Sequence, residues 1–132
     1  SIDVLIGIHG SALDNSVFLH KGSVLVQLLP YTVEHKCTFQ STAEKAGVHY
    51  MEWTLKERAN AVFHWDLLQQ ANANALASMS KEDYLRRGQR ASDSRETLMF
   101  WINQDIIVPL NEWKDIVHKA VRKSTAAQRG LT

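Results

Sequence analysis

The chain has 132 residues, of which 45% are hydrophobic and 22% are charged, and its formal net charge is +1. These values are ordinary for a soluble globular chain of one domain. A net charge so close to zero gives no reason to expect nucleic acid as a partner, and no apolar run reaches the roughly 18–20 residues of a membrane span. We therefore predict a single domain over residues 1–132.

Cys37 is the only cysteine, so an internal disulfide is impossible, and neither the compartment nor a partner for this thiol follows from the cysteine count. The chain starts at Ser1, close to a predicted buried strand and without a methionine. We interpret it as a piece of a longer protein, whose targeting signal would lie elsewhere.

Two continuous apolar runs, 4–8 and 24–29, predict buried parallel strands, with a short helix at 12–19 between them. Gly10 lies where the first strand gives way to this helix. Helix starts bind anions because their first N–H groups lack intrahelical partners and the helix dipole adds positive charge. A glycine has no Cβ to keep a ligand away from these groups. This unit predicts a nucleotide or sugar-phosphate ligand.

The next segments continue the alternation of strand and helix. Residues 39–46 predict a helix that ends at Gly47, and residues 48–53 predict a third strand rich in β-branched and aromatic side chains. Strand, helix, strand, helix, strand in this order predicts an α/β fold with a doubly wound, mainly parallel sheet and right-handed crossovers.

Residues 61–98 interrupt this rhythm, and we interpret them as a helical insertion. Within them, residues 61–78 have apolar side chains at helical spacing, and a capping box at 80–83 predicts a second helix as far as residue 91. Arginines and acidic residues alternate between 82 and 96, which predicts a solvated helix face.

The β pattern returns at residues 99–101 and 106–109. The last predicted helix is amphipathic, spans residues 110–123 and has Asn111 as its N-cap. Residues 125–132 predict a frayed tail.

Motifs for several catalytic chemistries are missing. The sequence contains neither a P-loop nor a GxGxxG motif, and Ser11 lacks the GxSxG frame of a nucleophile elbow. The six histidines have no HxxxH spacing, and no Asp-x-Asp pair is present. We expect no metal and no other cofactor.

Three polar residues fall at the carboxyl ends of the predicted strands, the edge where open α/β sheets bind ligands. His9 either contacts a diphosphate or braces the loop. Gln27 either holds ribose hydroxyls or makes a strand hydrogen bond, and Tyr31 packs either on a base or sugar or in the core. The residues by themselves leave these alternatives open.

Two segments resemble the signature of glycosyltransferase family 61. They are GIHGSALDNSVFL at residues 7–19 and GSVLVQLLPY at residues 22–31. The family signature reads approximately G-[MI]-H-G-A-x-L-[TS]-N-x-[LI]-F-L, then P-G-[SA]-x-V-[VI]-E-[IL]-F-P-Y. Residues 46–53 and 101–106 add weaker similarity.

This resemblance implies a Rossmann-like domain that forms the C-terminal, donor-binding half of a GT-B enzyme. It implies an inverting, metal-independent transfer of a sugar from a UDP-sugar to a glycan or glycoprotein acceptor, in the lumen of the Golgi or endoplasmic reticulum. The missing N-terminal half would hold most of the acceptor site. We therefore expect this fragment to be inactive alone, and the catalytic base stays unknown.

The resemblance also assigns the substrate-binding residues. The pyrophosphate would lie at the loop and helix start formed by His9, Gly10, Ser11, Ala12 and Leu13. Asn15 matches a common family Asn and orders the loop, Gln27 occupies the family's glutamate position as a ribose contact, and Tyr31 completes the site.

Two residues depart from the family pattern. Asp14 puts a carboxylate where the family has Thr or Ser, which is unfavourable beside a diphosphate, and Gln27 lacks the charge of the family's Glu. The alternative hypothesis is therefore a non-catalytic α/β binding or scaffold domain with a degenerate nucleotide site.

Overall fold

The computed structural model describes residues 3–33 and 38–131, without the side chains at positions 11, 12, 14, 15, 38, 128 and 131. Cys37 lies outside the described residues. The chain divides into two compact units where the sequence predicted a single domain. The first unit comprises Ser1–Leu29, Glu34–Thr54 and Val108–Thr132, and the second comprises Pro30–Val33 and Leu55–Ile107. The predicted insertion at 61–98 lies within the second unit.

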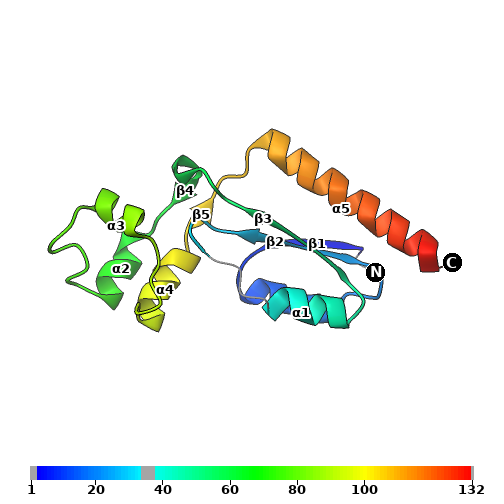
Figure 1. The fold of residues 1–132 in the computed structure, drawn as a ribbon, viewed down its shortest axis with the longest axis horizontal. Helices are drawn as coiled ribbons and strands as arrows, with labels where there is room; N and C mark the ends of the chain where they lie inside the picture. Colours follow the sequence, from blue (N-terminus) through cyan, green and yellow to red (C-terminus); the bar gives the residue numbers. More distant parts are fainter. Residues whose placement is uncertain (1–2, 34–37, 132) are drawn as a thin grey trace. The chain divides into compact units, whose positions relative to one another are not determined.

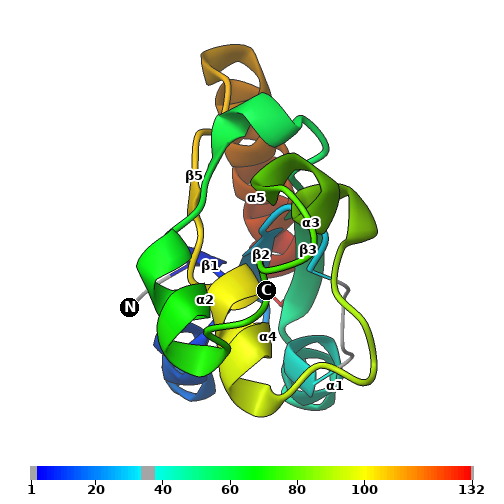
Figure 2. The same cartoon turned by 90° about the vertical axis from the view of Figure 1, so that its left-hand side faces the viewer.

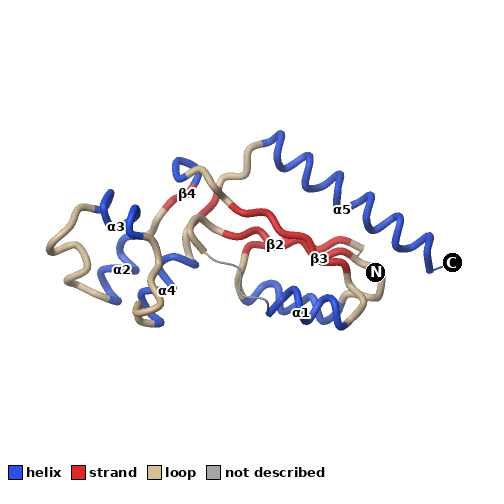
Figure 3. The backbone as a smooth tube through the Cα atoms, viewed as in Figure 1, coloured by secondary structure: helices blue, strands red, loops and turns tan. Residues whose placement is uncertain are grey.

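The first unit contains a three-stranded parallel sheet, in the order β1 (Val4–Ile8), β2 (Val24–Leu29) and β3 (His49–Thr54) (Figures 1 and 3). Every residue of the central strand β2 is buried, as its continuous apolar sequence predicts. The register pairs Gly7 with Gln27 and Gln27 with Glu52. The three strands therefore bring their carboxyl ends to one edge.

Helices cover both faces of this sheet. The 3₁₀ helix η1 (Ser11–Phe18) and α1 (Thr38–Lys45) lie on one face, and α5 (Leu110–Leu131) lies on the other (Figure 1). The core beneath η1 and α1 consists of Leu13, Leu19, Leu25, Ala43 and Val48. The predicted α/β class with a parallel sheet is confirmed, and this architecture is compatible with a Rossmann-like domain.

The end of α1 follows from its sequence. Gly47 adopts a φ of 75°, its N–H donates to the carbonyl of Glu44, and the N–H of Val48 donates to the carbonyl of Ala43. These two bonds form a Schellman motif, which satisfies carbonyls at the helix end. The predicted stop at Gly47 is confirmed.

The prediction for the last helix is right about its first residue and wrong about its N-cap and its end. It begins at Leu110, so Asn111 lies inside it, and it continues to Leu131, where a frayed tail was expected. The side chains of Ile116, Ala120 and Ser124 are buried, whereas Leu110 is 66% exposed. Spacing of four residues keeps these three side chains on the sheet side, whereas residues 125, 126, 129 and 130 are exposed.

The second unit combines short helices with a two-stranded antiparallel sheet. Helices α2 (Trp65–Ala71) and α4 (Arg95–Ile102) pack side by side (Figure 2). The core of this unit is aromatic: the ring centroid of Phe63 lies 5.7 Å from that of Phe100 and 5.9 Å from that of Trp101. The elements of the second unit are η2 (Arg58–Asn60), β4 (Ala61–Val62), α2 (Trp65–Ala71), α3 (Lys81–Arg87), α4 (Arg95–Ile102) and β5 (Asp105–Ile106).

Two predictions in this unit are wrong. The helical pattern at 61–78 forms a helix only at Trp65–Ala71, because Asn72 leaves helical geometry and its side chain accepts a hydrogen bond from the N–H of Asn74. Residues 99–101, predicted as strand, belong to α4. Ser94 caps that helix by accepting a bond from the N–H of Thr97. The predicted cap at Ser80 is confirmed by the same kind of bond, from the N–H of Asp83.

No helix among residues 3–33 and 38–131 is both long and apolar enough to cross a membrane.

Candidate functional site

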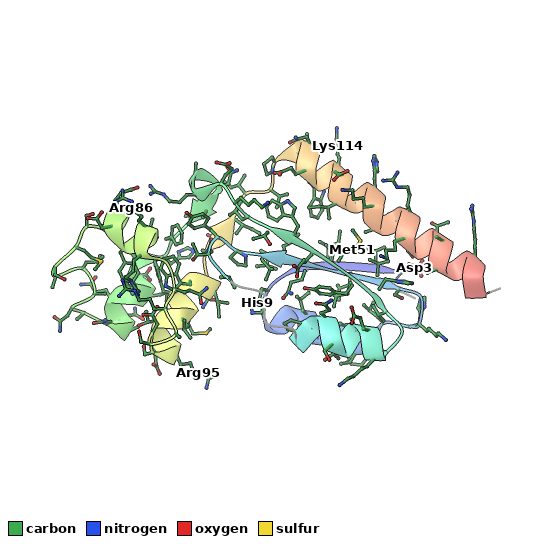
Figure 4. All side chains as sticks on the ribbon, in the orientation of Figure 1. Asp3, His9, Met51, Arg86, Arg95 and Lys114 are labelled. Carbon is green, nitrogen blue, oxygen red and sulfur yellow. The ribbon has the colours of Figure 1, made fainter. Side chains whose placement is uncertain are left out.

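The predicted ligand edge of the first unit begins with His9, directly after β1. The N–H of His9 donates to the carbonyl of Leu28 at 2.9 Å, which extends the pairing of β1 with β2 by one residue. The imidazole lies edge-on to Phe39 of α1, with 5.8 Å between ring centroids. Figure 4 labels His9 at this end of the sheet. The side chain is thus held on one side by a strand and on another by a helix.

Gly10 makes the turn from β1 into η1. Its φ of 154° and ψ of −175° fall in a region that only glycine adopts readily. A Cβ at this position would lie 4.0 Å from its nearest neighbour, the carbonyl oxygen of Ile8. The backbone conformation, and not lack of space, therefore requires glycine here.

The helix after this turn is a 3₁₀ helix of eight residues. Its first ring closes when the N–H of Leu13 donates to the carbonyl of Gly10 at 3.1 Å, and Gly10 has no side chain to cap it. The N–H groups of Ser11 and Ala12 precede that bond and so have no partner within the helix. Leu13 itself is fully buried, so its side chain belongs to the core.

The side chains of Ser11, Ala12, Asp14 and Asn15 lie outside the described side chains, so only the backbone of this segment can be discussed. The predicted roles of Asn15 in ordering the loop and of Asp14 beside a diphosphate stay predictions.

A chain of hydrogen bonds crosses the sheet at this edge. His9 Nδ1 lies 2.5 Å from Gln27 Oε1, Gln27 Nε2 donates to the hydroxyl of Tyr50 at 2.6 Å, and that hydroxyl donates to Glu52 Oε2 at 2.9 Å. Gln27 is fully buried. Its amide is thus bonded at both ends within the chain. The sequence did not point to Tyr50 or Glu52; the signal was their i, i+2 spacing, which places both on the strand face of Gln27.

The predicted ribose contact of Gln27 stays a prediction, although in this structure the amide bridges His9 and Tyr50. Tyr31 belongs to the second unit, where its N–H and carbonyl both bond the buried side chain of Gln104, each at 2.8 Å. Its ring lies 6.4 Å from that of Phe63. A role of Tyr31 beside a nucleotide therefore also stays a prediction.

In the arginine cluster of the second unit, Arg86, Arg90 and Arg95 are exposed, as the predicted solvated face requires, and Arg87 is the exception. The side chain of Arg87 is only 10% exposed and forms two hydrogen bonds with Asp93, at 3.2 and 3.3 Å. Both residues line a polar pocket together with Arg90, Ser94 and Thr97. The charge of Arg87 is already neutralised by Asp93, so this pocket has less attraction for an anion than its arginines suggest.

Among residues 3–33 and 38–131, no three His, Cys, Asp or Glu side chains are grouped so that they could hold a metal ion.

The first unit is thus an α/β domain with a parallel sheet and a His-Gly turn at the carboxyl ends of its strands. Comparison with known proteins shows the class of its relatives. The chain is 22% identical over 134 residues to the protein O-linked-mannose β-1,4-N-acetylglucosaminyltransferase 2 of Xenopus laevis, covering 96% of this chain and 23% of that protein. It is 26% identical over 129 residues to the Takifugu rubripes protein of the same name, covering 90% and 22%. It is 33% identical over 58 residues to the alpha-1,3-arabinosyltransferase XAT2 of Oryza sativa subsp. japonica, covering 42% and 10%.

These relatives are members of glycosyltransferase family 61, so the resemblance seen in the sequence is confirmed as homology to glycosyltransferases. No protein-family model matches the chain. The chain spans less than a quarter of the length of the relatives described here.

Proposed function

We propose that this chain is the donor-binding part of an inverting, metal-independent glycosyltransferase that moves a sugar from a UDP-sugar to a glycan or glycoprotein acceptor. The observation that carries the proposal is the His9-Gly10 turn at the carboxyl end of β1, in a chain homologous to glycosyltransferases. Ligands of open α/β sheets bind at this edge of the sheet.

The backbone at this turn suits a diphosphate. The N–H groups at the start of η1 lack partners within the helix, and Gly10 puts no Cβ in front of them. In the proposed reaction a base takes the proton of an acceptor hydroxyl, whose oxygen attacks the anomeric carbon as the bond to UDP breaks. Negative charge then develops on the leaving diphosphate, where fixed N–H donors and the helix dipole stabilise it most.

The side chains divide into two roles in this proposal. His9 contacts the nucleotide diphosphate, and Gln27 contributes through its bond to His9. The backbone of Ser11, Ala12, Leu13 and Asn15 forms the segment that wraps the pyrophosphate, while the side chain of Leu13 stays in the core.

The remaining parts of the proposal concern the whole protein. We propose that the chain is the C-terminal half of a GT-B enzyme, that an N-terminal half supplies most of the acceptor site, and that the protein works in the lumen of the secretory pathway. The isolated chain would then bind donor without turning it over.

Titration calorimetry with UDP tests the proposal. We expect the parent chain to bind UDP equally well with and without EDTA. His9→Ala should weaken binding by about tenfold or more, since it removes the hydrogen bond between the imidazole and the diphosphate. Gly10→Val should abolish it, because valine cannot adopt the backbone conformation of Gly10. His118→Ala, an exposed histidine on α5, is the matched control and should bind like the parent.

A parent chain that fails to bind millimolar UDP requires the same titration on the longer protein that contains it. Absence of binding there too would overturn the proposal and favour the scaffold alternative.

A further inference from the structure

The hydrogen bonds between His9 and Glu52 form one continuous chain with a defined direction. Ionised Glu52 can only accept, so the hydroxyl hydrogen of Tyr50 is donated to its Oε2. The phenol oxygen must then accept from the Gln27 side chain, and only its Nε2 can donate. This fixes the orientation of the amide, that is, which of its two similar ends is the oxygen and which is the nitrogen.

The orientation of Gln27 in turn fixes the protonation of His9. Its carbonyl oxygen, Oε1, faces His9 Nδ1 at 2.5 Å and has no hydrogen to give. Nδ1 must therefore carry a proton. A reversed amide would need the Tyr50 hydroxyl to donate to Gln27 and would take that hydrogen away from Glu52.

Burial makes this arrangement rigid. Gln27 is fully buried, so water cannot replace either of its partners, and a hydrogen bond in such a place is stronger than at the surface. Glu52, in contrast, is exposed, and its carboxylate can only accept hydrogen bonds. An exposed carboxylate thus sets the tautomer of a histidine two strands away.

We propose that Tyr50 and Glu52 are positioning residues that, through Gln27, hold His9 with its proton on Nδ1 and leave Nε2 as the ring atom that meets the ligand. The functional part of this inference rests on the proposed donor site. Nε2 then accepts a hydrogen bond from a sugar hydroxyl when the ring is neutral and donates to a phosphate oxygen when it is protonated. Nδ1 keeps its proton in both states.

Two-bond ¹H–¹⁵N NMR spectra of the histidines test the tautomer directly, because protonated and unprotonated ring nitrogens have distinct ¹⁵N shifts. In the parent with a neutral His9 ring, we expect the Nδ1–H tautomer. In Tyr50→Phe and in Glu52→Ala the Gln27 amide is free to reverse, so the Nε2–H tautomer should become populated. Tyr84→Phe removes a buried hydroxyl in the second unit and should leave the spectrum of His9 unchanged.

UDP affinity provides the second measurement. Tyr50→Phe and Glu52→Ala should weaken UDP binding roughly three- to tenfold, because His9 then presents the wrong tautomer to the ligand. Tyr84→Phe should leave UDP binding unchanged. Glu52 is exposed, so its variant stays informative if Tyr50→Phe fails to fold.

The outcomes separate the two proposals. A parent His9 in the Nε2–H form, or a tautomer unchanged in both variants, overturns the positioning role whatever UDP does. A tautomer that shifts without any change in a measurable UDP affinity also overturns it. A shifted tautomer in a protein that never binds UDP refutes the donor site and leaves the hydrogen-bond chain as a tautomer lock alone.

Discussion

Gly7 of β1 leaves open the space that the side chain of Leu13 fills. A Cβ on Gly7 would lie 2.5 Å from Cδ2 of Leu13, closer than real Cβ atoms come to their neighbours. Leu13 is fully buried and packs with Leu25 and Ala43. Only three residues, 8–10, connect Gly7 to the start of η1, so this contact also constrains the His9-Gly10 turn. The core and the candidate site thus depend on the same glycine.

We predict that Gly7→Ala destabilises the chain by about 1–3 kcal/mol, because the added methyl overpacks the core against Leu13. Urea unfolding measures this change. Gly130→Ala in α5 is the control: nothing lies within 4 Å of its Cβ position, so it should leave stability unchanged or raise it by up to about 1 kcal/mol. In the Gly7→Ala background, Leu13→Ala should cost less than it does alone. Equal stability of Gly7→Ala and parent would contradict the close packing.

Asp93 is predicted to stabilise the second unit far more than an exposed acid does. It bonds Arg87 at both oxygens and accepts from the N–H of Arg90, and its side chain is 11% exposed. Asp93→Ala leaves a buried guanidinium without its counter-charge and should cost about 3 kcal/mol in urea unfolding. Asp83→Ala breaks an exposed pair with Arg86 and should cost at most about 1 kcal/mol. Similar losses for the two variants would argue against a special role of the buried pair.

The Arg58–Glu82 pair predicts a pH dependence. The hydrogen bond from Arg58 lowers the pKa of the Glu82 carboxyl below its ordinary value of 4.5. A carboxyl whose pKa is lower in the folded state stabilises the fold above its unfolded pKa and loses that contribution as the pH falls through the lowered value. Arg58→Gln should therefore be less stable than the parent at neutral pH, and the difference should vanish in acid.

Chemical denaturation of both proteins across this pH range measures the effect. Because both side chains are largely exposed, high salt should reduce the difference at neutral pH. A difference that persists after Glu82 is protonated would show that Arg58 stabilises the unit by other contacts.

Local sequence determined the elements whose signals lie within a few residues. The apolar runs of β1 and β2, the stop at Gly47 and the cap at Ser80 each depend on neighbours along the chain, through parallel strands, a left-handed glycine and a side-chain cap. The predicted burial holds for β2 and not for β1, whose residues are half-buried or exposed. The same local reading placed His9 and Gly10 at the end of a parallel strand. It also sufficed for the resemblance to the glycosyltransferases, since that rests mainly on two neighbouring segments, residues 7–19 and 22–31.

Tertiary structure decided what depends on residues far apart in the sequence. Residues 99–101 read as strand by composition but form a helix, because α4 buries Phe100 and Trp101 among aromatic rings from other segments. The division into two units depends likewise on packing between segments far apart in the sequence. The helical end of α5 is different, because residues 125, 126, 129 and 130 are exposed and burial does not explain it. Gln27 shows the same limit at the candidate site: its sequence position suggested a ligand, but only the register of three strands brings its amide between His9 and Tyr50.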